Sequence, residues 1–138
     1  MDFAARFAGA QDVAARMGLP DVLPLATHLS PDRASEEIAA HLAKAGRSID
    51  GIFAATDTLA ALCLTQLRAE GLRVPEDVRL VGFDDLPIAR QTVPPLTTVR
   101  QDIAAGAHGL VDLLLRRLAG ETTESLVLPP ELALRETA

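Results

Sequence analysis

A strand–helix–strand pattern in the middle of the chain limits the possible folds more than any other part of the sequence. Residues 51–55 are continuously apolar, as expected of a parallel strand covered on both faces. A helical pattern follows and ends at Gly71, and Pro75 then precedes a second apolar strand over residues 78–83. Two strands joined by a helix over roughly 30 residues form a right-handed parallel crossover. The sheet must therefore be at least partly parallel.

Helical spacing of apolar residues predicts further helices on both sides of this unit. The first helix stops at Gly18, because glycine readily takes the left-handed conformation that ends a helix. Ser30 before Pro31 has the signature of an N-cap, and Asp102 can cap a later helix. The predicted helices span residues 2–17, 31–45, 58–70 and 103–118, with stops at Gly18, Gly46, Gly71 and Gly120.

Short apolar or β-branched runs predict the remaining strands. Pro24 cannot donate to a sheet ladder, so the run around it suits an edge strand. The sequence therefore predicts an α/β fold, with a mostly parallel open sheet and helices on both faces. The additional strands are expected at residues 22–26, 96–100, 126–128 and 131–135, with a short helix or turn at 86–92.

Length and composition exclude several classes of protein. A chain of 138 residues with 49% hydrophobic content is expected to form one soluble domain. No apolar run approaches the ~20 residues of a membrane span, and the N-terminus lacks the order of a signal peptide. The formal net charge of −6 would repel a phosphate backbone, so this chain should not bind DNA by itself. We expect neither membrane insertion nor export.

The sequence also lacks the residue patterns that carry catalysis. It has no nucleophile paired with a base, no glycine-rich phosphate loop and no metal-binding cluster. The single cysteine, Cys63, lies on an apolar helix and is expected to be a core residue. A small α/β enzyme or a response-regulator-like module is therefore disfavoured, and we expect no enzyme activity, no cofactor and no metal.

Four motifs in sequence resemble the effector-binding region of the LacI/GalR family of bacterial transcriptional repressors. No single motif is decisive, but their order and spacing match the family over nearly the whole chain. They are Ala55-Thr56-Asp57, the stretch at residues 71–78, Val81-Gly82-Phe83-Asp84-Asp85, and the stretch at residues 95–101.

The resemblance implies a particular place for this chain in a larger protein. Family members carry a helix-turn-helix head that reads operator DNA, a hinge, and two similar α/β subdomains that clamp a small-molecule effector. The chain matches the C-terminal subdomain of this periplasmic-binding-protein-like (type I) fold, truncated at the N-terminus. About 1–100 and 121–138 would form that subdomain, whereas about 101–120 would be a helix of the otherwise absent N-terminal subdomain.

The function implied is binding of a sugar or other small molecule that controls DNA binding allosterically, in the cytoplasm. Operator DNA would be contacted only through the missing helix-turn-helix. The alternative is a solute-binding protein of a sugar transport system, which shares the fold and the cleft. Without its own subdomain, the helix at 103–118 would expose an apolar face, so we expect a homodimer or an exchange of elements.

Two candidate ligand-binding residues are charged. Asp57 follows a buried strand and matches the family aspartate that accepts hydrogen bonds from effector hydroxyls or ring nitrogens; the alternative is a helix N-cap. Arg6 matches the family arginine that reaches the ligand from the first helix. Its forked guanidinium suits carboxylates and vicinal hydroxyls.

The other candidates are uncharged. Leu29 occupies a position where relatives often carry an aromatic that stacks on the effector ring, and its aliphatic side chain argues for a different or smaller ligand. Gln101 matches a polar residue near the cleft, although a solvent-exposed strand end is the alternative. Asp84 and Asp85 belong to the family signature, and we assign them mainly to turn architecture.

Overall fold

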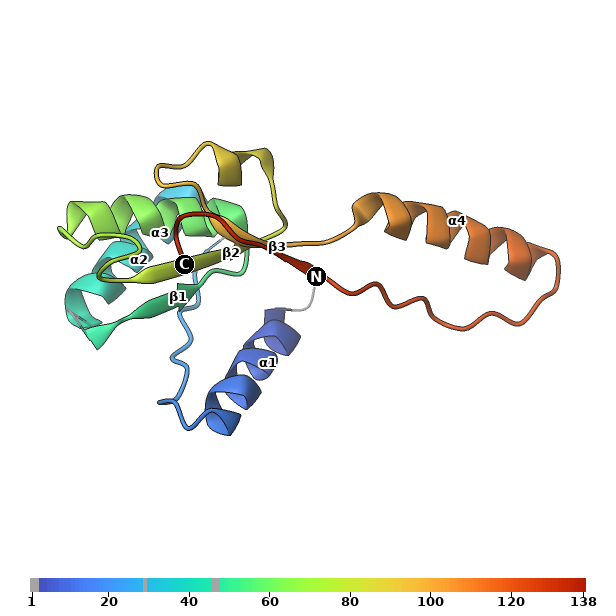
Figure 1. Cartoon of the computed structure of the whole chain (residues 1–138), viewed down its shortest axis with the longest axis horizontal. Helices are drawn as coiled ribbons and strands as arrows, with labels where there is room; N and C mark the ends of the chain where they lie inside the picture. The colour runs from blue at the N-terminus through green and yellow to red at the C-terminus, as the bar shows by residue number, and fades with distance from the viewer. Residues whose placement is uncertain (1–2, 29, 46–47) are drawn as a thin grey trace.

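The protein is built around one four-stranded sheet (Figure 1). The computed structural model describes residues 3–28, 30–45 and 48–138. The strand order is β1-β2-β3-β4, with β1, β2 and β3 parallel and β4 antiparallel to β3. The elements are α1 (Phe3–Arg16), α2 (Pro31–Ala45), β1 (Gly51–Phe53), α3 (Asp57–Ala69), β2 (Arg79–Phe83), η2 (Pro87–Arg90), β3 (Thr97–Arg100), α4 (Ile103–Leu118) and β4 (Glu131–Ala133). The predicted α/β fold with a mostly parallel sheet is confirmed.

The central crossover forms as the sequence predicts. β1 and β2 pair in parallel through Ile52 and Leu80, and α3 connects them. The N-cap of α3 is Thr56, whose hydroxyl accepts a hydrogen bond from the Leu59 amide at 3.2 Å. Beyond the helix, Gly71 takes a φ of +72°, the left-handed conformation expected of a helix stop.

The hydrophobic core lies between one face of the sheet and the α2–α3 pair. Leu80 of β2 and Leu96 beside β3 are fully buried and meet Leu67 of α3, which is equally inaccessible. Ile38 of α2, which is 2% exposed, belongs to the same cluster. Helical spacing on α2 and α3 and alternation along β2 therefore converge on one core.

The opposite face of the sheet carries α1. Phe83 alternates with the buried Gly82 along β2, so its ring points away from α3 and lies under the Arg6 side chain of α1. Only Ala14 of α1 is buried, so this helix covers its face sparsely. Helices thus lie on both faces, as predicted.

The C-terminal residues hydrogen-bond to the beginnings of β2 and β3. Thr137 is fully buried, and its hydroxyl donates to the Leu80 carbonyl at 2.7 Å while accepting from the Thr97 amide at 2.8 Å. The Leu80 amide in turn donates to the Thr137 carbonyl. The last residues of the chain therefore supply backbone partners that β2 and β3 would otherwise lack.

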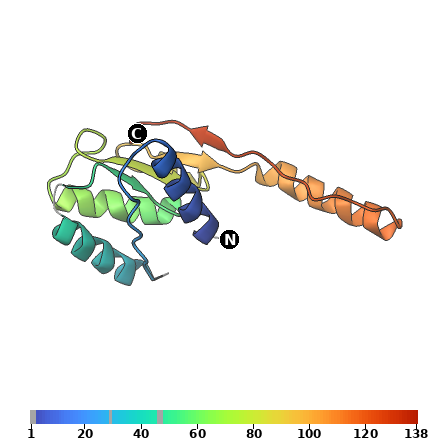
Figure 2. The same ribbon diagram turned by 90° about the horizontal axis from the view of Figure 1, so that it is seen from below.

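Helix α4 extends away from the rest of the molecule (Figure 1). None of its residues is buried, and Leu110, Leu114 and Leu118 are 70%, 58% and 76% exposed. The returning segment, residues 119–130, runs back beside the helix (Figure 2). Leu126 packs so closely on Gly109 that a Cβ there would lie 2.3 Å from Leu126 Cδ2. The exposed apolar face expected from the sequence is present.

Two strand predictions are wrong. Residues 22–26 and 126–128 have no regular secondary structure and belong to no sheet. A strand exists only when a neighbouring strand pairs with its backbone, and the described residues place no strand beside either segment. The apolar runs are real, but apolar pattern alone does not supply a partner. The predicted stop at Gly46 lies outside the described residues.

Among the described residues, no helix is both long enough and apolar enough to cross a membrane.

Where β2 passes α3, there is no room for a side chain at Gly82. Substitution of this glycine therefore tests the packing of β2 against α3. A Cβ at this position would lie 2.3 Å from Asp57 Oδ1 and 2.9 Å from Leu96 Cδ2. We expect Gly82→Ala to lower the free energy of unfolding by about 3 kcal/mol through this overlap, measured by urea denaturation. The matched control is Gly51→Ala on β1, where the nearest atom is 4.0 Å from the new Cβ. Equal stability of the two variants would contradict the packing.

Candidate functional site

Three polar side chains from distant parts of the sequence lie near the carboxyl ends of the parallel strands. Asp84 follows β2 directly, Gln101 follows β3 directly, and Arg6 extends from α1. Gln101 Nε2 donates to Asp84 Oδ1 at 3.1 Å, and the charge of Arg6 acts on the Asp84 carboxylate. In open α/β sheets, ligands bind beyond the carboxyl ends of the strands. This group is therefore the candidate site.

The Arg6 guanidinium is held in place from two directions. Its Nη1 donates to the Ala55 carbonyl at 2.7 Å, just beyond β1. Its Cζ lies 3.5 Å from the centroid of the Phe83 ring and 5.7 Å from that of Phe3. Such stacking on an aromatic face is favourable for a cation. Since a guanidinium has several N–H donors, Arg6 can hold Ala55 and still donate to a ligand.

Asp84 owes its position to an unusual backbone conformation. Its φ is 105°, and it and Asp85 are the only non-glycine residues with positive φ in the described part of the chain. Burial raises the pKa of Asp84, with a further contribution from the nearby charge of Asp57, and this outweighs the opposing effects of Arg6 and Gln101. Asp84 is thus a half-buried carboxylate whose pKa responds to a nearby guanidinium, the pattern of a functional group.

Asp57 lies at the strand end predicted for it, but its side chain faces inward. It is fully buried, with Oδ1 accepting from the Thr98 hydroxyl at 2.5 Å and Oδ2 accepting from the Leu86 amide at 2.6 Å. Both oxygens therefore serve the fold, and the carboxylate is not open to a ligand in this structure. Nor is Asp57 the helix N-cap that was the alternative, since Thr56 takes that role.

The two consecutive aspartates have different environments. Asp85 turns away from Asp84 and accepts hydrogen bonds from Arg90, Arg100 and Arg135. Burial acts to raise the pKa of Asp85, but the hydrogen bonds from Arg135 and Arg100 and the charges of Arg135 and Arg90 outweigh it and lower that pKa. Turn architecture, the role inferred for both from the sequence, describes Asp85 well, whereas Asp84 faces the site.

Arg6 and Gln101 therefore both lie near Asp84, whereas the Asp57 carboxylate is buried beside Gly82. Leu29 lies outside the described residues. Asp84, assigned mainly to a turn from the sequence, lies at the candidate site, and its position at the end of a buried strand was a usable signal. Stacking of Arg6 on Phe83 had no signal in the sequence, because it joins residues 77 positions apart.

Comparison with known proteins agrees with this geometry. The family described as periplasmic binding protein-like domain matches residues 3–138. The chain is 44% identical over 91 residues to the HTH-type transcriptional regulator CelR of Thermobifida fusca, covering 64% of this chain and 27% of that protein. The chain therefore spans little more than a quarter of this relative's length.

Two solved structures have the same fold and contain a sugar. A transcriptional regulator CelR–cellobiose complex superposes with a TM-score of 0.85 at 34% identity, over 96% of this chain and 42% of that one. A LacI family transcriptional regulator from Arthrobacter sp. FB24, in complex with lactose, gives 0.78 at 30% identity, over 91% and 48%. The chain belongs to the periplasmic binding protein-like domain family, and its relatives are the LacI-type transcriptional regulators that the sequence motifs resemble.

Proposed function

We propose that this chain forms half of the effector-binding core of a LacI/GalR-type transcriptional repressor and that its effector is a sugar. The observation that carries the proposal is the convergence of Arg6, Asp84 and Gln101 at the carboxyl ends of the strands. The cellobiose and lactose in the two related structures support the choice of a sugar.

The chemistry of these three groups is complementary to a sugar. Each sugar hydroxyl both donates and accepts a hydrogen bond, so it can donate to the Asp84 carboxylate and accept from the Arg6 guanidinium. The Gln101 amide can do either. Because the chain contains no Trp and no Tyr, ring stacking contributes less here, and we assign most of the affinity to these polar contacts.

Control of DNA binding would come from movement of a second lobe, which the chain enters and leaves through the two segments on either side of α4. We propose that α4 and residues 119–130 belong to a second lobe, which closes over the effector from the other side. An effector that prefers one arrangement of the two lobes shifts their equilibrium, with a coupling of typically ~1–3 kcal/mol. The names of the relatives favour this role over transport of a solute.

The proposed regulator acts as a homodimer in the cytoplasm and contacts operator DNA through a helix-turn-helix outside these 138 residues. The net charge of −6 fits this division, because an acidic surface repels a phosphate backbone. The exposed leucines of α4 fit a helix that packs against further protein.

Sugar binding by Asp84 and Arg6 is tested by NMR chemical-shift titration with cellobiose and with lactose. We expect binding of at least one sugar, weakened roughly tenfold or more by Asp84→Asn and by Arg6→Gln, because each loses a charged hydrogen bond. Arg16→Gln is the control, since Arg16 lies on the same helix and pairs only with the exposed Asp12 among the described residues. Unchanged affinity in the Asp84 and Arg6 variants would contradict the site.

The separate role of Asp57 is tested by stability. We expect Asp57→Asn to lower the free energy of unfolding by about 2 kcal/mol, because an amide cannot accept both from the Thr98 hydroxyl and from the Leu86 amide. Asp84→Asn should leave stability nearly unchanged in the same urea titration. If Asp57→Asn were as stable as the unaltered chain, the buried contact would not have the importance assigned to it.

Exposure of α4 predicts self-association of the isolated chain. We expect sedimentation velocity to show a dimer or larger species at micromolar concentration, because a face of exposed leucines is costly in water. Replacing Leu110 and Leu114 together by Glu should give a monomer with unchanged helix content. A monodisperse monomer of the unaltered chain would refute this prediction.

A further inference from the structure

Asp84 and Asp85 direct their carboxylates to two different places. Both have positive φ, 105° for Asp84 and 51° for Asp85. Left-handed backbone is unusual outside glycine and persists where surrounding contacts fix it. Asp84 meets Gln101 at the candidate site, whereas Asp85 meets a group of arginines on the β3–β4 side of the sheet. The contacts of Asp85 are therefore part of what holds Asp84 in place.

The Asp85 carboxylate is shared by three guanidinium groups. Its Oδ2 accepts from Arg100 Nε at 2.7 Å and from Arg90 Nη2 at 3.0 Å, and its Oδ1 accepts from Arg135 Nη2 at 2.5 Å. The side chain is only 4% exposed, so these charge-assisted bonds are shielded from water on the carboxylate side. Glu131 adds a second, more distant carboxylate, 3.8 Å from Arg100.

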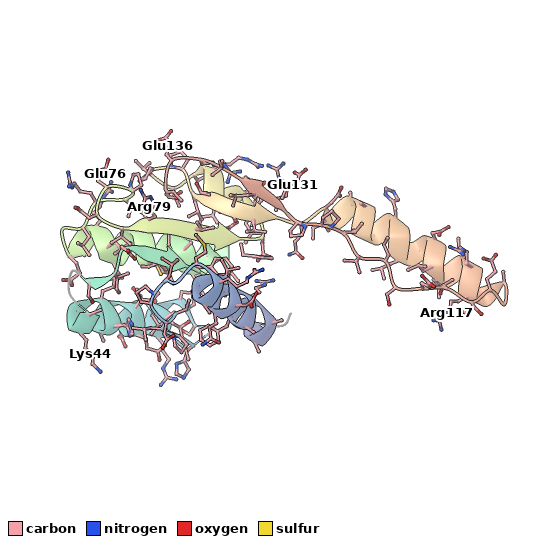
Figure 3. The ribbon with its side chains drawn as sticks, turned by 60° about the horizontal axis from the view of Figure 1, so that its bottom comes forward. Lys44, Glu76, Arg79, Arg117, Glu131 and Glu136 are labelled. Carbon is pink, nitrogen blue, oxygen red and sulfur yellow. The ribbon has the colours of Figure 1, made fainter. Side chains whose placement is uncertain are left out.

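Two of the partners of Asp85 lie on or next to β3 and β4, the strands through which the chain leaves for α4 and returns from it. Arg100 is the last residue of β3, and Arg135 follows β4 by two positions. The two strands pair in antiparallel register with Arg100 opposite Glu131. In Figure 3, Glu131 lies on β4 where the ribbon leaves the sheet, and Arg117 lies toward the far end of α4. Asp85 therefore ties β3, and the chain just beyond β4, to the end of β2.

We propose that Asp85 is a positioning residue, which holds β3 and β4 against the end of β2 so that bending toward α4 begins at Gln101 and Asp84 stays directed at the effector. The role of this bending in regulation rests on the proposed function. The positioning role of Asp85 itself rests only on its contacts with Arg100 and Arg135.

Gln101 connects the strand end held by Asp85 with the candidate site. It is the first residue after Arg100, and its side chain donates to Asp84 Oδ1 at 3.1 Å. Rotation of the α4 segment about this point changes the contact between Gln101 and Asp84, while Arg100 stays fixed. One side chain thereby links the movement of the second lobe to the carboxylate that faces the ligand.

Loss of the Asp85 charge should loosen this region selectively. Without the carboxylate, Arg90, Arg100 and Arg135 would remain close together with their charges unbalanced on that side. Mutual repulsion would separate β3 from β4 and remove the support for the positive φ of Asp84. Arg135 also donates to the carbonyl of the core residue Leu96, but no side chain of α3 is hydrogen-bonded to this charge cluster among the described residues, so α3 should be unaffected.

Hydrogen–deuterium exchange on the whole chain without ligand tests the proposal. In Asp85→Asn we expect amides of residues 84–86, 99–102 and 131–135 to exchange roughly tenfold faster, because local opening there becomes easier. Amides of α3 should keep their rates. The matched control is Asp77→Asn, which removes a carboxylate that accepts three hydrogen bonds from Arg73 at the other end of the sheet. It should leave residues 99–102 unchanged.

A second variant covers the case in which Asp85→Asn does not fold. Arg100→Gln keeps Asp85 paired with Arg90 and Arg135 but releases β3, so it should speed exchange at residues 99–102 and leave α3 unchanged. Uniform acceleration across the chain would show a merely structural role and overturn the proposal, as would unchanged exchange at 99–102. Since no ligand is used, failure of sugar binding would not produce either result.

Discussion

The buried carboxylate of Asp57 is the contact on which the functional end of this fold depends. It joins the start of α3 to β3 through the Thr98 hydroxyl and to the turn before η2 through the Leu86 amide. Gly82 makes room for it, since any side chain there would overlap the carboxylate. One charged group therefore aligns three segments at the carboxyl edge of the sheet. A buried carboxylate is costly unless hydrogen-bonded, and here both oxygens are.

This alignment lets three aspartates serve three purposes. Asp57 organises the strand ends, Asp85 binds arginines of η2, of β3 and of the chain beyond β4, and Asp84 lies near Arg6. The three residues are of the same type, but they differ in burial, in hydrogen-bond partners and in backbone conformation. The site is small and polar. We propose that it provides one wall of a cleft, in keeping with a chain that spans under half of the related sugar-bound structures.

The sequence predicts local structure better than the roles of individual side chains. Glycine stops such as Gly71, the cap at Asp102 and the parallel crossover follow from short-range patterns, and the structure confirms them. Strands at 22–26 and 126–128 do not form, because pairing requires a neighbour that local pattern cannot supply. The sequence shows that Asp57 and Asp84 end strands, but not that one points inward and the other toward Arg6. That difference depends on Thr98 and on the positive φ of Asp84.

The central claim is that Asp84, and not the buried Asp57, meets the effector. The most direct measurement is the ¹³C carboxyl resonance of each aspartate, recorded while cellobiose or lactose is added to the chain. We expect saturating sugar to shift the Asp84 resonance and to leave that of Asp57 in place. A shift confined to Asp57, with Asp84 unmoved, would contradict it and would mean that the Thr98 and Leu86 contacts give way to the ligand.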